Sequence, residues 1–587
     1  ARRLPRWGLL VLAAWTVGLG VALGLATDRT NFVPNTLTYA IVPLVFLAAS
    51  RIWRRRWGPA LTLGLVLAAA GKYWQRSFLQ WWGNALLDND TRWLPLSWWN
   101  PSAVLMGMFG LLFLAFANLG RRVMAVAAGL ASAALLAGVW LSASRGGLLA
   151  VVVGVVVVVA AAWRHRHRSS RSGRAVVVAT VGVLAGAVVV SLLLTGMTES
   201  GGQPIAEREQ RAATNALARL EHMKAAAGMF VDRPLLGHGP GSYREIAPEF
   251  TAPTANLTTE AHNQYIQVLA EGGIVFGVPF IIAMGMLAWL AVRVVRVPSP
   301  AVTYDDPVRR PAVVGAVGMV AVLLAHSAVD FDWAFPVLPV LGAVGAAILW
   351  VEAGPEGFAA KAERTMGRRL AWVAVGAAGL ALCVAAGLAL AYSASGNAEE
   401  VSPEELAISP VPWDAPEHAR FAFLLLRDDE VDAARIAVDR GLTWNPGHDR
   451  LRIADAAVEH AEGTRTTNEL VSELDHPPGW LQGYVDVAEY LVATGELDAA
   501  QRVAQRGIEE MTLRHAWGHR SLVADSHMLL IHIAAEQGGC EAARVQADVA
   551  RRAPLASDLN GFEQAVDDRL EMLCSDTGMD QDVRDEP

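Results

Sequence analysis

Long runs of apolar residues, separated by short polar segments, fill the chain up to about residue 393. A helix needs about 20 mostly apolar residues to cross a membrane. The pattern therefore predicts about eleven membrane-spanning helices, near residues 8–27, 36–50, 58–72, 102–119, 123–141, 147–163, 175–195, 270–292, 311–328, 335–351 and 370–393. The first run follows three arginines, and we interpret it as an uncleaved first helix.

The pattern changes after residue 393, where the sequence becomes charged and alanine-rich and has no spanning run. The chain therefore divides into a membrane domain, 1–393, and a second domain, 394–587. In the second domain Asp432-Ala-Ala, Asp498-Ala-Ala and Glu541-Ala-Ala align, and the first two are 66 residues apart. This is about twice the period near 34 of tetratricopeptide repeats. We predict a tetratricopeptide-like α-solenoid with a concave surface for a protein partner, and an all-α fold for the whole chain.

Composition supports a membrane protein, because 53% of the residues are hydrophobic and only 18% are charged. Arginine clusters alternate with the predicted spans, and cytoplasmic loops carry an excess of basic residues. With the N-terminus inside, every cytoplasmic loop is arginine-rich, at residues 51–56, 121–122, 164–174, 293–310 and 364–369. The predicted orientation therefore places the long loop 196–269 and the C-terminal domain outside the cytoplasm.

Two further features of the predicted outer side leave alternatives open. The loop 73–101 holds six tryptophans, which favour either a segment lying on the membrane surface or stacking against sugars. Cys540 and Cys574 lie in neighbouring predicted helices of an oxidising compartment, where a disulfide can form if their Cα atoms are within about 7 Å.

Three segments carry the candidate chemistry: "LSASRGGLLA" at 141–150, "NALARLEHMKAAAGMFVDRPLLGHGPGSY" at 215–243 and "TTEAHNQYIQVLAEGGIVFG" at 258–277. Together, in this order and topology, they resemble the core of the O-antigen ligase superfamily. That superfamily includes lipopolysaccharide O-antigen ligases, polysaccharide polymerases and protein O-oligosaccharyltransferases. The resemblance implies a metal-independent, GT-C-like glycosyltransferase of the bacterial inner membrane. It also implies a polyprenyl (undecaprenyl) diphosphate-linked glycan donor and no cofactor.

The resemblance and the chemistry select Arg145, Arg219 and His262 as catalytic candidates. Arginine is always charged and binds phosphate through two parallel hydrogen bonds, so Arg145 and Arg219 suit a departing diphosphate. Arg211 and Arg233 compete with Arg219. His262 suits removal of the acceptor proton near neutral pH. Each candidate also has a purely structural interpretation. Arg145 could extend to the membrane interface, Arg219 could lie on a solvated helix face, and His262 could belong to the core.

Seven neighbouring residues are predicted to bind substrate or orient these groups: Ser144, Gly239, Gly241, Tyr243, Glu260, Asn263 and Tyr265. The glycine-rich turn at 237–241 either cradles phosphate or is a tight turn. Asp330-x-Asp332 and Asp88-x-Asp90 could hold a metal, but we expect Asp330 and Asp332 to pair with the arginines instead.

The predicted function is transfer of the lipid-linked glycan to an acceptor hydroxyl. The acceptor is a lipid A core sugar, a growing glycan chain or a protein, and we favour a ligase or polymerase. A transporter (flippase) for the same lipid-linked glycans and a non-catalytic assembly scaffold are the alternatives from other classes. Membrane lipids complete the expected partners, and no nucleic acid is expected.

Overall fold

The computed structural model describes residues 4–24, 32–54, 59, 62, 99–142, 144–167, 174–196, 205–251, 258–296, 308–353, 415–475, 481–513, 520–553 and 561–575. Every secondary-structure element in these ranges is helical, which confirms the all-α prediction. The predicted span at 370–393 lies outside the described residues, as do Asp88, Asp90 and almost all of 58–72 and the tryptophan-rich loop.

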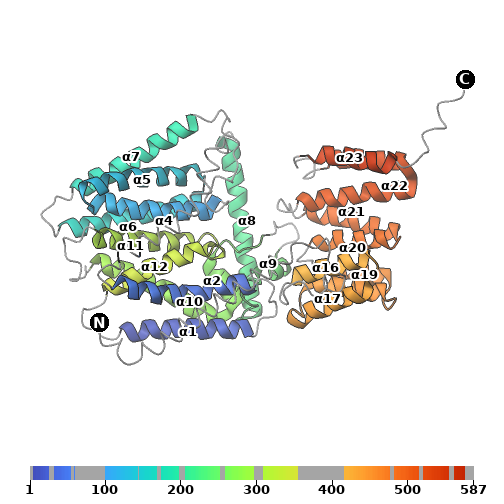
Figure 1. Cartoon of the computed structure of the whole chain (residues 1–587), viewed down its shortest axis with the longest axis horizontal. Helices are drawn as coiled ribbons and strands as arrows, with labels where there is room; N and C mark the ends of the chain where they lie inside the picture. Colours follow the sequence, from blue (N-terminus) through green and yellow to red (C-terminus); the bar gives the residue numbers. More distant parts are fainter. Residues whose placement is uncertain are drawn as a thin grey trace, which may run out of the picture.

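The apolar runs form the helices of a membrane bundle (Figure 1). They are α1 (Leu4–Gly24), α2 (Phe32–Trp53), α4 (Trp99–Leu119), α5 (Arg122–Leu141), α6 (Arg145–His167), α7 (Arg174–Gly196), α10 (Gln264–Arg296), α11 (Arg309–His326) and α12 (Val337–Ala353). Five of them, α4, α5, α6, α10 and α11, contain stretches that are long and apolar enough to cross a membrane. The short predicted run at 36–50 is the middle of α2, which has 22 residues.

Helix α4 forms the centre of the bundle, packed against α5, α6 and α11. Other parts of the protein cover 89% of its span, but only 33% of the span of α5. Small residues let these helices approach closely, as is common inside membranes. A Cβ added at Gly107 of α4 would lie 2.3 Å from Val151 Cγ2 of α6, so a larger side chain would push the two helices apart.

A buried carboxylate connects three helices at the end of the bundle where α2 and α12 end. Glu352 Oε1 accepts hydrogen bonds from Trp53 Nε1 at 2.8 Å and from Arg309 Nε at 2.8 Å. This contact joins the last residue of α2, the last turn of α12 and the first residue of α11. We refer to it as the Glu352 lock.

At the opposite end, the predicted loop 196–269 contains helical structure of its own. Helix α8 (Ile205–Asp232) runs across the ends of the membrane helices (Figure 1). It is followed by α9 (Tyr243–Ile246) and the 3-10 helix η2 (Ala247–Phe250). A second 3-10 helix, η3 (Asp332–Ala334), follows α11 at this end.

The C-terminal helices stack in antiparallel order on the α8 side of the bundle (Figure 1). They are α16 (Ala415–Arg427), α17 (Val431–Trp444), α18 (Asp449–Ala461), α19 (Thr467–Ser472), η5 (Glu473–Asp475), α20 (Gln482–Ala493), α21 (Leu497–Leu513), α22 (Arg520–Arg551) and α23 (Phe562–Ser575). The aligned motifs begin equivalent helices: Asp432 lies at the start of α17 and Asp498 at the start of α21. Glu541 follows Gly539, whose φ of 69° divides α22 into two helices. Their assignment as tetratricopeptide-like repeats stays a prediction.

A disulfide joins the residue after the Gly539 kink of α22 to the last turn of α23. Cys540 and Cys574 are bonded, and their Cα atoms are 5.5 Å apart. This distance lies within the range that a disulfide allows, so the bridge that the sequence left open is present.

Candidate active site

Polar residues from four separate segments meet at the α8 end of the bundle. Asn100 lies in the first turn of α4, Ser144 precedes α6, His262 precedes α10, and Asp330 lies between α11 and η3. Each occupies a position where an apolar helix begins or ends, so the membrane helices bring together residues that are far apart in the sequence. We call the group around Asp330 the Asp330 cluster.

Asp330 is the centre of this cluster. Its Oδ1 lies 3.2 Å from His262 Nδ1, and its Oδ2 lies 3.7 Å from an Arg219 guanidinium nitrogen. Oδ2 also accepts a hydrogen bond from Asn100 Nδ2 and lies 3.8 Å from His326 Nε2. Burial disfavours the charged carboxylate, but the His262 hydrogen bond and the charges of His326 and Arg219 outweigh it and lower the pKa of Asp330. Asp330 therefore remains an anion that binds and orients cationic groups.

His262 is held in a defined orientation. Its ring stacks on His222 of α8, with centroids 5.5 Å apart, and meets Phe331 edge-on at 5.0 Å. With Nδ1 directed at Asp330, Nε2 is the ring nitrogen that can accept a proton from a substrate. The backbone of His262 has a φ of 52°, a left-handed conformation that non-glycine residues rarely adopt and that clusters at functional sites.

Arg219 connects α8 to the cluster. One guanidinium nitrogen donates a hydrogen bond to the Val329 carbonyl at 3.0 Å, next to Asp330. The Arg219 side chain as a whole is 30% exposed. Of its rivals, Arg233 is not at the cluster but beside Asp232, with 3.6 Å between the charged atoms. The side chain of Arg211 lies outside the described residues.

Arg145 begins α6 with an exposed side chain, and both of its neighbours touch the cluster. Ser144 Oγ donates a hydrogen bond to Asn100 Oδ1 at 2.8 Å and accepts one from Gly147 N at 3.0 Å. A Cβ added at Gly146 would lie 3.3 Å from His326 Nε2. Ser144 therefore shapes the turn that begins α6, and this turn places Arg145 beside the Asp330 cluster.

Asn263 and Tyr265 fix the start of α10, directly after His262. Asn263 Oδ1 accepts hydrogen bonds from Tyr265 N and Ile266 N, both at 3.1 Å, and thereby caps the helix. Asn263 Nδ2 donates to the Ala328 carbonyl at 2.9 Å, and the Tyr265 hydroxyl donates to the Leu324 carbonyl at 2.9 Å. Both side chains thus tie α10 to the end of α11 and position His262 indirectly.

The glycine-rich turn forms a separate buried group around Glu271. Gly239 N donates to the Glu271 carbonyl at 2.8 Å, and the Glu271 carboxylate accepts from the backbone of Gly241 and of Tyr243. The Tyr243 hydroxyl donates to the His222 carbonyl at 2.9 Å. These backbone donors bind α10 rather than an open surface, which favours the tight-turn interpretation over a phosphate cradle.

Glu260 belongs to this second group and not to the Asp330 cluster. Its carboxylate accepts a hydrogen bond from Gln267, whose amide also donates to Glu271 Oε1 at 3.1 Å. Burial and the nearby Glu271 carboxylate raise the pKa of Glu260 to about 8. The structure therefore places Glu260 with Gln267 and Glu271, and its role in binding substrate or orienting the catalytic groups stays a prediction.

The acidic pair after α11 binds protein groups. Asp330 contacts Arg219, whereas Asp332 Oδ1 lies 2.7 Å from His326 Nδ1 and its Oδ2 accepts from Ser327 Oγ at 3.0 Å. Asp330 thus pairs with an arginine, as predicted. Asp332 does not, because its partners are a histidine and a serine. Within the described ranges, no group of three or more His, Cys, Asp or Glu side chains could hold a metal ion.

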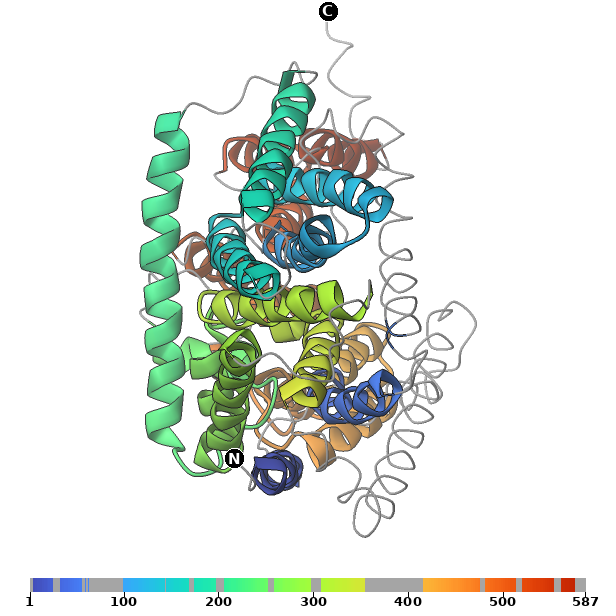
Figure 2. The same cartoon turned by 90° about the vertical axis from the view of Figure 1, so that its left-hand side faces the viewer.

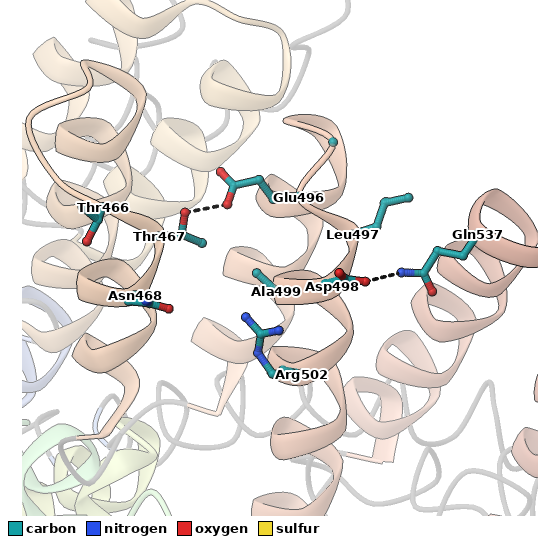
Figure 3. Close-up of a pocket in the computed structure, with 10 residues that line it drawn as sticks. Thr466, Thr467, Asn468, Glu496, Leu497, Asp498, Ala499, Arg502 and Gln537 are labelled. Atoms are coloured by element: carbon teal, nitrogen blue, oxygen red, sulfur yellow. Dashed lines mark hydrogen bonds between the residues drawn. The ribbon is translucent and has the colours of Figure 1, made fainter.

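A further groove lies in the C-terminal helices, away from the Asp330 cluster (Figure 3). It has a volume of about 620 Å³ and lies between the start of α19, the start of α21 and Gln537 of α22. Several of its polar groups bind one another: Thr467 Oγ1 donates to Glu496 at 2.6 Å, and Gln537 donates to Asp498 at 2.9 Å. The groove is a surface between helical pairs rather than a site with converging catalytic groups.

Residues 130–282 match the protein family described as O-Antigen ligase. The chain carries an O-antigen ligase domain. The match confirms the resemblance based on the three sequence segments, and it supports glycan transfer of the ligase or polymerase type. No curated protein and no solved structure matches the chain.

The matched range of this O-antigen ligase domain contains Arg145, Arg219 and His262, but Asp330 lies beyond it. Sequence reasoning had placed Asp330 among groups that pair with arginine and did not identify it as the centre of the site. It also missed Asn100 and His222. Nothing in the sequence signals these two, because their roles depend on where α4 and α8 pack.

Proposed function

We propose that the Asp330 cluster is the active site of a glycosyltransferase that uses a polyprenyl diphosphate-linked glycan. The observation that carries this proposal is that Arg219 and His262 meet on one carboxylate, within a bundle that contains an O-antigen ligase domain. Arg145 begins α6 beside them. The cluster thus combines cations suited to a diphosphate with a base suited to a hydroxyl.

In the proposed reaction the acceptor oxygen attacks the anomeric carbon of the donor sugar, and the bond from that carbon to the diphosphate oxygen breaks. His262 Nε2 takes the proton from the acceptor hydroxyl, and Asp330 stabilises the resulting imidazolium. Arg219 and Arg145 bind the departing diphosphate, where negative charge grows. The arginines supply the charge neutralisation that a divalent ion would otherwise give, so the proposed transfer is independent of metal and of other cofactors.

The proposed site faces outside the cytoplasm. Arginines gather at the end of the bundle that holds the Glu352 lock, where the described membrane helices carry Arg51, Arg121, Arg122, Arg164, Arg293, Arg296, Arg309 and Arg310. At the opposite end, the first residue of α6, Arg145, is beside the Asp330 cluster. The positive-inside rule places the Glu352 end in the cytoplasm. The Asp330 cluster, α8 and the C-terminal domain then share the extracytoplasmic side of a bacterial inner membrane.

The acceptor is a sugar hydroxyl on a lipid A core or on a growing glycan chain. A protein acceptor is the second candidate, because the C-terminal helical pairs lie on the same side of the bundle as the Asp330 cluster (Figure 1). Such stacked pairs are suited to holding a protein partner. The alternative functions, a lipid-linked glycan transporter and an assembly scaffold, are distinguished by the same experiment.

The test is a transfer assay with purified full-length protein in lipid vesicles. The protein is incubated with a polyprenyl diphosphate-linked glycan and, in separate reactions, a lipid A core oligosaccharide, a non-reducing glycan end and an unfolded protein. We expect one acceptor to gain the glycan, with release of polyprenyl diphosphate and equal yield in EDTA. Donor movement across the membrane without transfer would identify a transporter. Binding without transfer or movement would identify a scaffold.

A further inference from the structure

The outer face of α8 carries an apolar stripe. Leu217, Leu220, Ala227 and Val231 are all exposed, with Leu217 at 67% and Val231 at 75%. Their spacing of three to four residues, completed by Lys224, places them on one side of the helix. The opposite side packs into the protein through buried residues, namely His222, Ala225, Ala226 and Met229. We call the exposed side the α8 stripe.

The α8 stripe lies at the level where the membrane helices end. Arg219 of α8 is bonded to the Val329 carbonyl, just after α11, and α8 packs against α10. Helix α8 runs perpendicular to the membrane helices in Figure 1, and Figure 2 shows it along the edge of the bundle. In the view of Figure 2, no other described helix lies on the side of α8 that faces away from the bundle.

Exposed apolar side chains also lie beyond the end of α8, next to the outward side of α10. Beyond α8, Leu235 is 65% exposed, and its carbonyl accepts a hydrogen bond from Val275 N of α10 at 3.1 Å. Ile274, which is 43% exposed, donates to the Pro234 carbonyl at 2.8 Å. Ile274 begins an outward apolar face on α10 that includes Val278, Ile281 and Ile282.

A glycine makes this proximity possible. Gly273 has a φ of 56°, and a Cβ added there would lie 2.4 Å from the Leu235 carbonyl oxygen. Only a residue without a side chain lets the segment after α8 lie against the backbone of α10 at this point. The α8 stripe and the exposed apolar face of α10 are therefore neighbours on the surface, with the exposed Asp232–Arg233 pair between Val231 and Leu235 in the sequence.

We propose that α8 is a membrane-surface helix whose stripe inserts into the outer part of the bilayer. An amphipathic helix of this kind lies in the membrane plane with its apolar side about 5–10 Å into the boundary between headgroups and acyl chains. Lys224 lies exposed within the stripe and pairs with Glu221 at 2.6 Å. In the proposed placement its flexible side chain exchanges this partner for a lipid phosphate. The bilayer is the occupant because the stripe lies next to the exposed apolar face of α10, a helix long and apolar enough to cross a membrane.

This membrane contact has a consequence for the Asp330 cluster. Arg219 lies between Leu217 and Leu220 in the sequence, on the helix that the bilayer would hold in place. Insertion of the stripe keeps Arg219 against Asp330 and fixes the cluster at the depth of lipid phosphate groups. The inference concerns the placement of α8 and does not depend on the proposed transfer reaction, since a transporter or scaffold could use the same helix.

The test uses fluorescent labels and quenching lipids. Bimane is attached to Leu220→Cys or Val231→Cys in a Cys383→Ser background, and to Val545→Cys as a matched control. Val545 is also apolar and 61% exposed, but lies on α22 of the C-terminal domain. Each protein is reconstituted into phosphatidylethanolamine–phosphatidylglycerol vesicles with nitroxide lipids that quench either near the headgroup or near the chain end.

We expect the shallow nitroxide to remove most fluorescence from the two α8 labels and little from the Val545 label. The deep nitroxide should quench the α8 labels less than the shallow one, and aqueous iodide should quench only the Val545 label strongly. Equal iodide quenching of all three labels would overturn the proposal by placing α8 in water. Protection of the α8 labels from iodide and from both nitroxide lipids would overturn it by showing that protein covers the stripe.

Discussion

The two ends of the membrane bundle each hold a buried carboxylate, but its partners differ. In the Glu352 lock the partners are Arg309 and the Trp53 indole, groups that do not change their charge in the physiological pH range. In the Asp330 cluster they include His262, which can change its charge, together with the part-exposed Arg219. His262 also has a left-handed backbone. The Glu352 end thus joins helices through groups of fixed charge, whereas the Asp330 end holds the groups that suit the proposed reaction.

The largest predicted difference is between neutralising the two carboxylates. We expect Asp330→Asn to reduce transfer by about 10²–10⁴-fold, because His262 loses the group that orients it and stabilises its charged form. Glu352→Gln should leave transfer by the folded protein nearly unchanged, and should destabilise the bundle by about 3 kcal/mol through loss of a buried ion pair. Turnover in vesicles and thermal unfolding of both variants measure this contrast. Equal effects on turnover would remove the distinction between the two ends.

Replacement of arginine by lysine should weaken donor binding at the Asp330 end but not at the Glu352 end. An ammonium lacks the planar fork that binds two phosphate oxygens. Loss of one charged hydrogen bond, worth about 1.5–3 kcal/mol, corresponds to a roughly 10–100-fold decrease in transfer for Arg219→Lys. The matched change Arg309→Lys should keep wild-type donor affinity. Donor binding by isothermal titration distinguishes them, and an unaltered affinity in Arg219→Lys would argue against a diphosphate contact.

A smaller effect should appear in the pH dependence of stability. The folded protein raises the pKa of Glu260 to about 8, from an ordinary value of 4.5. Unfolding then releases a proton between these values, so the stability contributed by Glu260 falls as pH rises from about 4.5 to 8. Glu260→Gln should make the melting temperature less dependent on pH across this window. An unchanged pH profile in Glu260→Gln would show that Glu260 is not buried beside Glu271.

Reduction of the C-terminal disulfide is expected to have the smallest effect on transfer. Reduction of Cys540–Cys574 should destabilise α22 and α23 by about 2–4 kcal/mol, because the unfolded segment gains freedom. Hydrogen exchange at residues 520–575 should accelerate, while exchange in the membrane helices and transfer stay unchanged. Reduced transfer after mild reduction would instead connect this segment to the Asp330 cluster.

Local patterns predicted the helices well and the site only in part. Apolar runs define membrane helices through composition alone, so the predicted spans at 102–119, 123–141 and 311–328 coincide with α4, α5 and α11. Arg219 and His262 were predictable because they lie in recognisable segments. Their meeting on Asp330 was not, since it depends on how α8, α10 and α11 pack.

The glycine-rich turn illustrates the same limit. Glycines at 237, 239 and 241 fit both a phosphate cradle and a tight turn, because both need positive φ angles. Only the three-dimensional contacts with Glu271 separate the two interpretations. Asn100 likewise looks ordinary in the sequence, and its role becomes visible only beside Ser144 and Asp330.

The most direct test of the proposed active site is to measure donor binding and turnover separately in His262→Ala. If His262 takes the acceptor proton, the variant should bind the polyprenyl diphosphate-linked glycan with wild-type affinity and transfer it about 10²–10⁴-fold more slowly. His532→Ala, a change on α22 of the C-terminal domain, serves as the matched control and should leave both quantities unchanged. Normal turnover in folded, membrane-inserted His262→Ala would contradict the assignment of the Asp330 cluster as the active site.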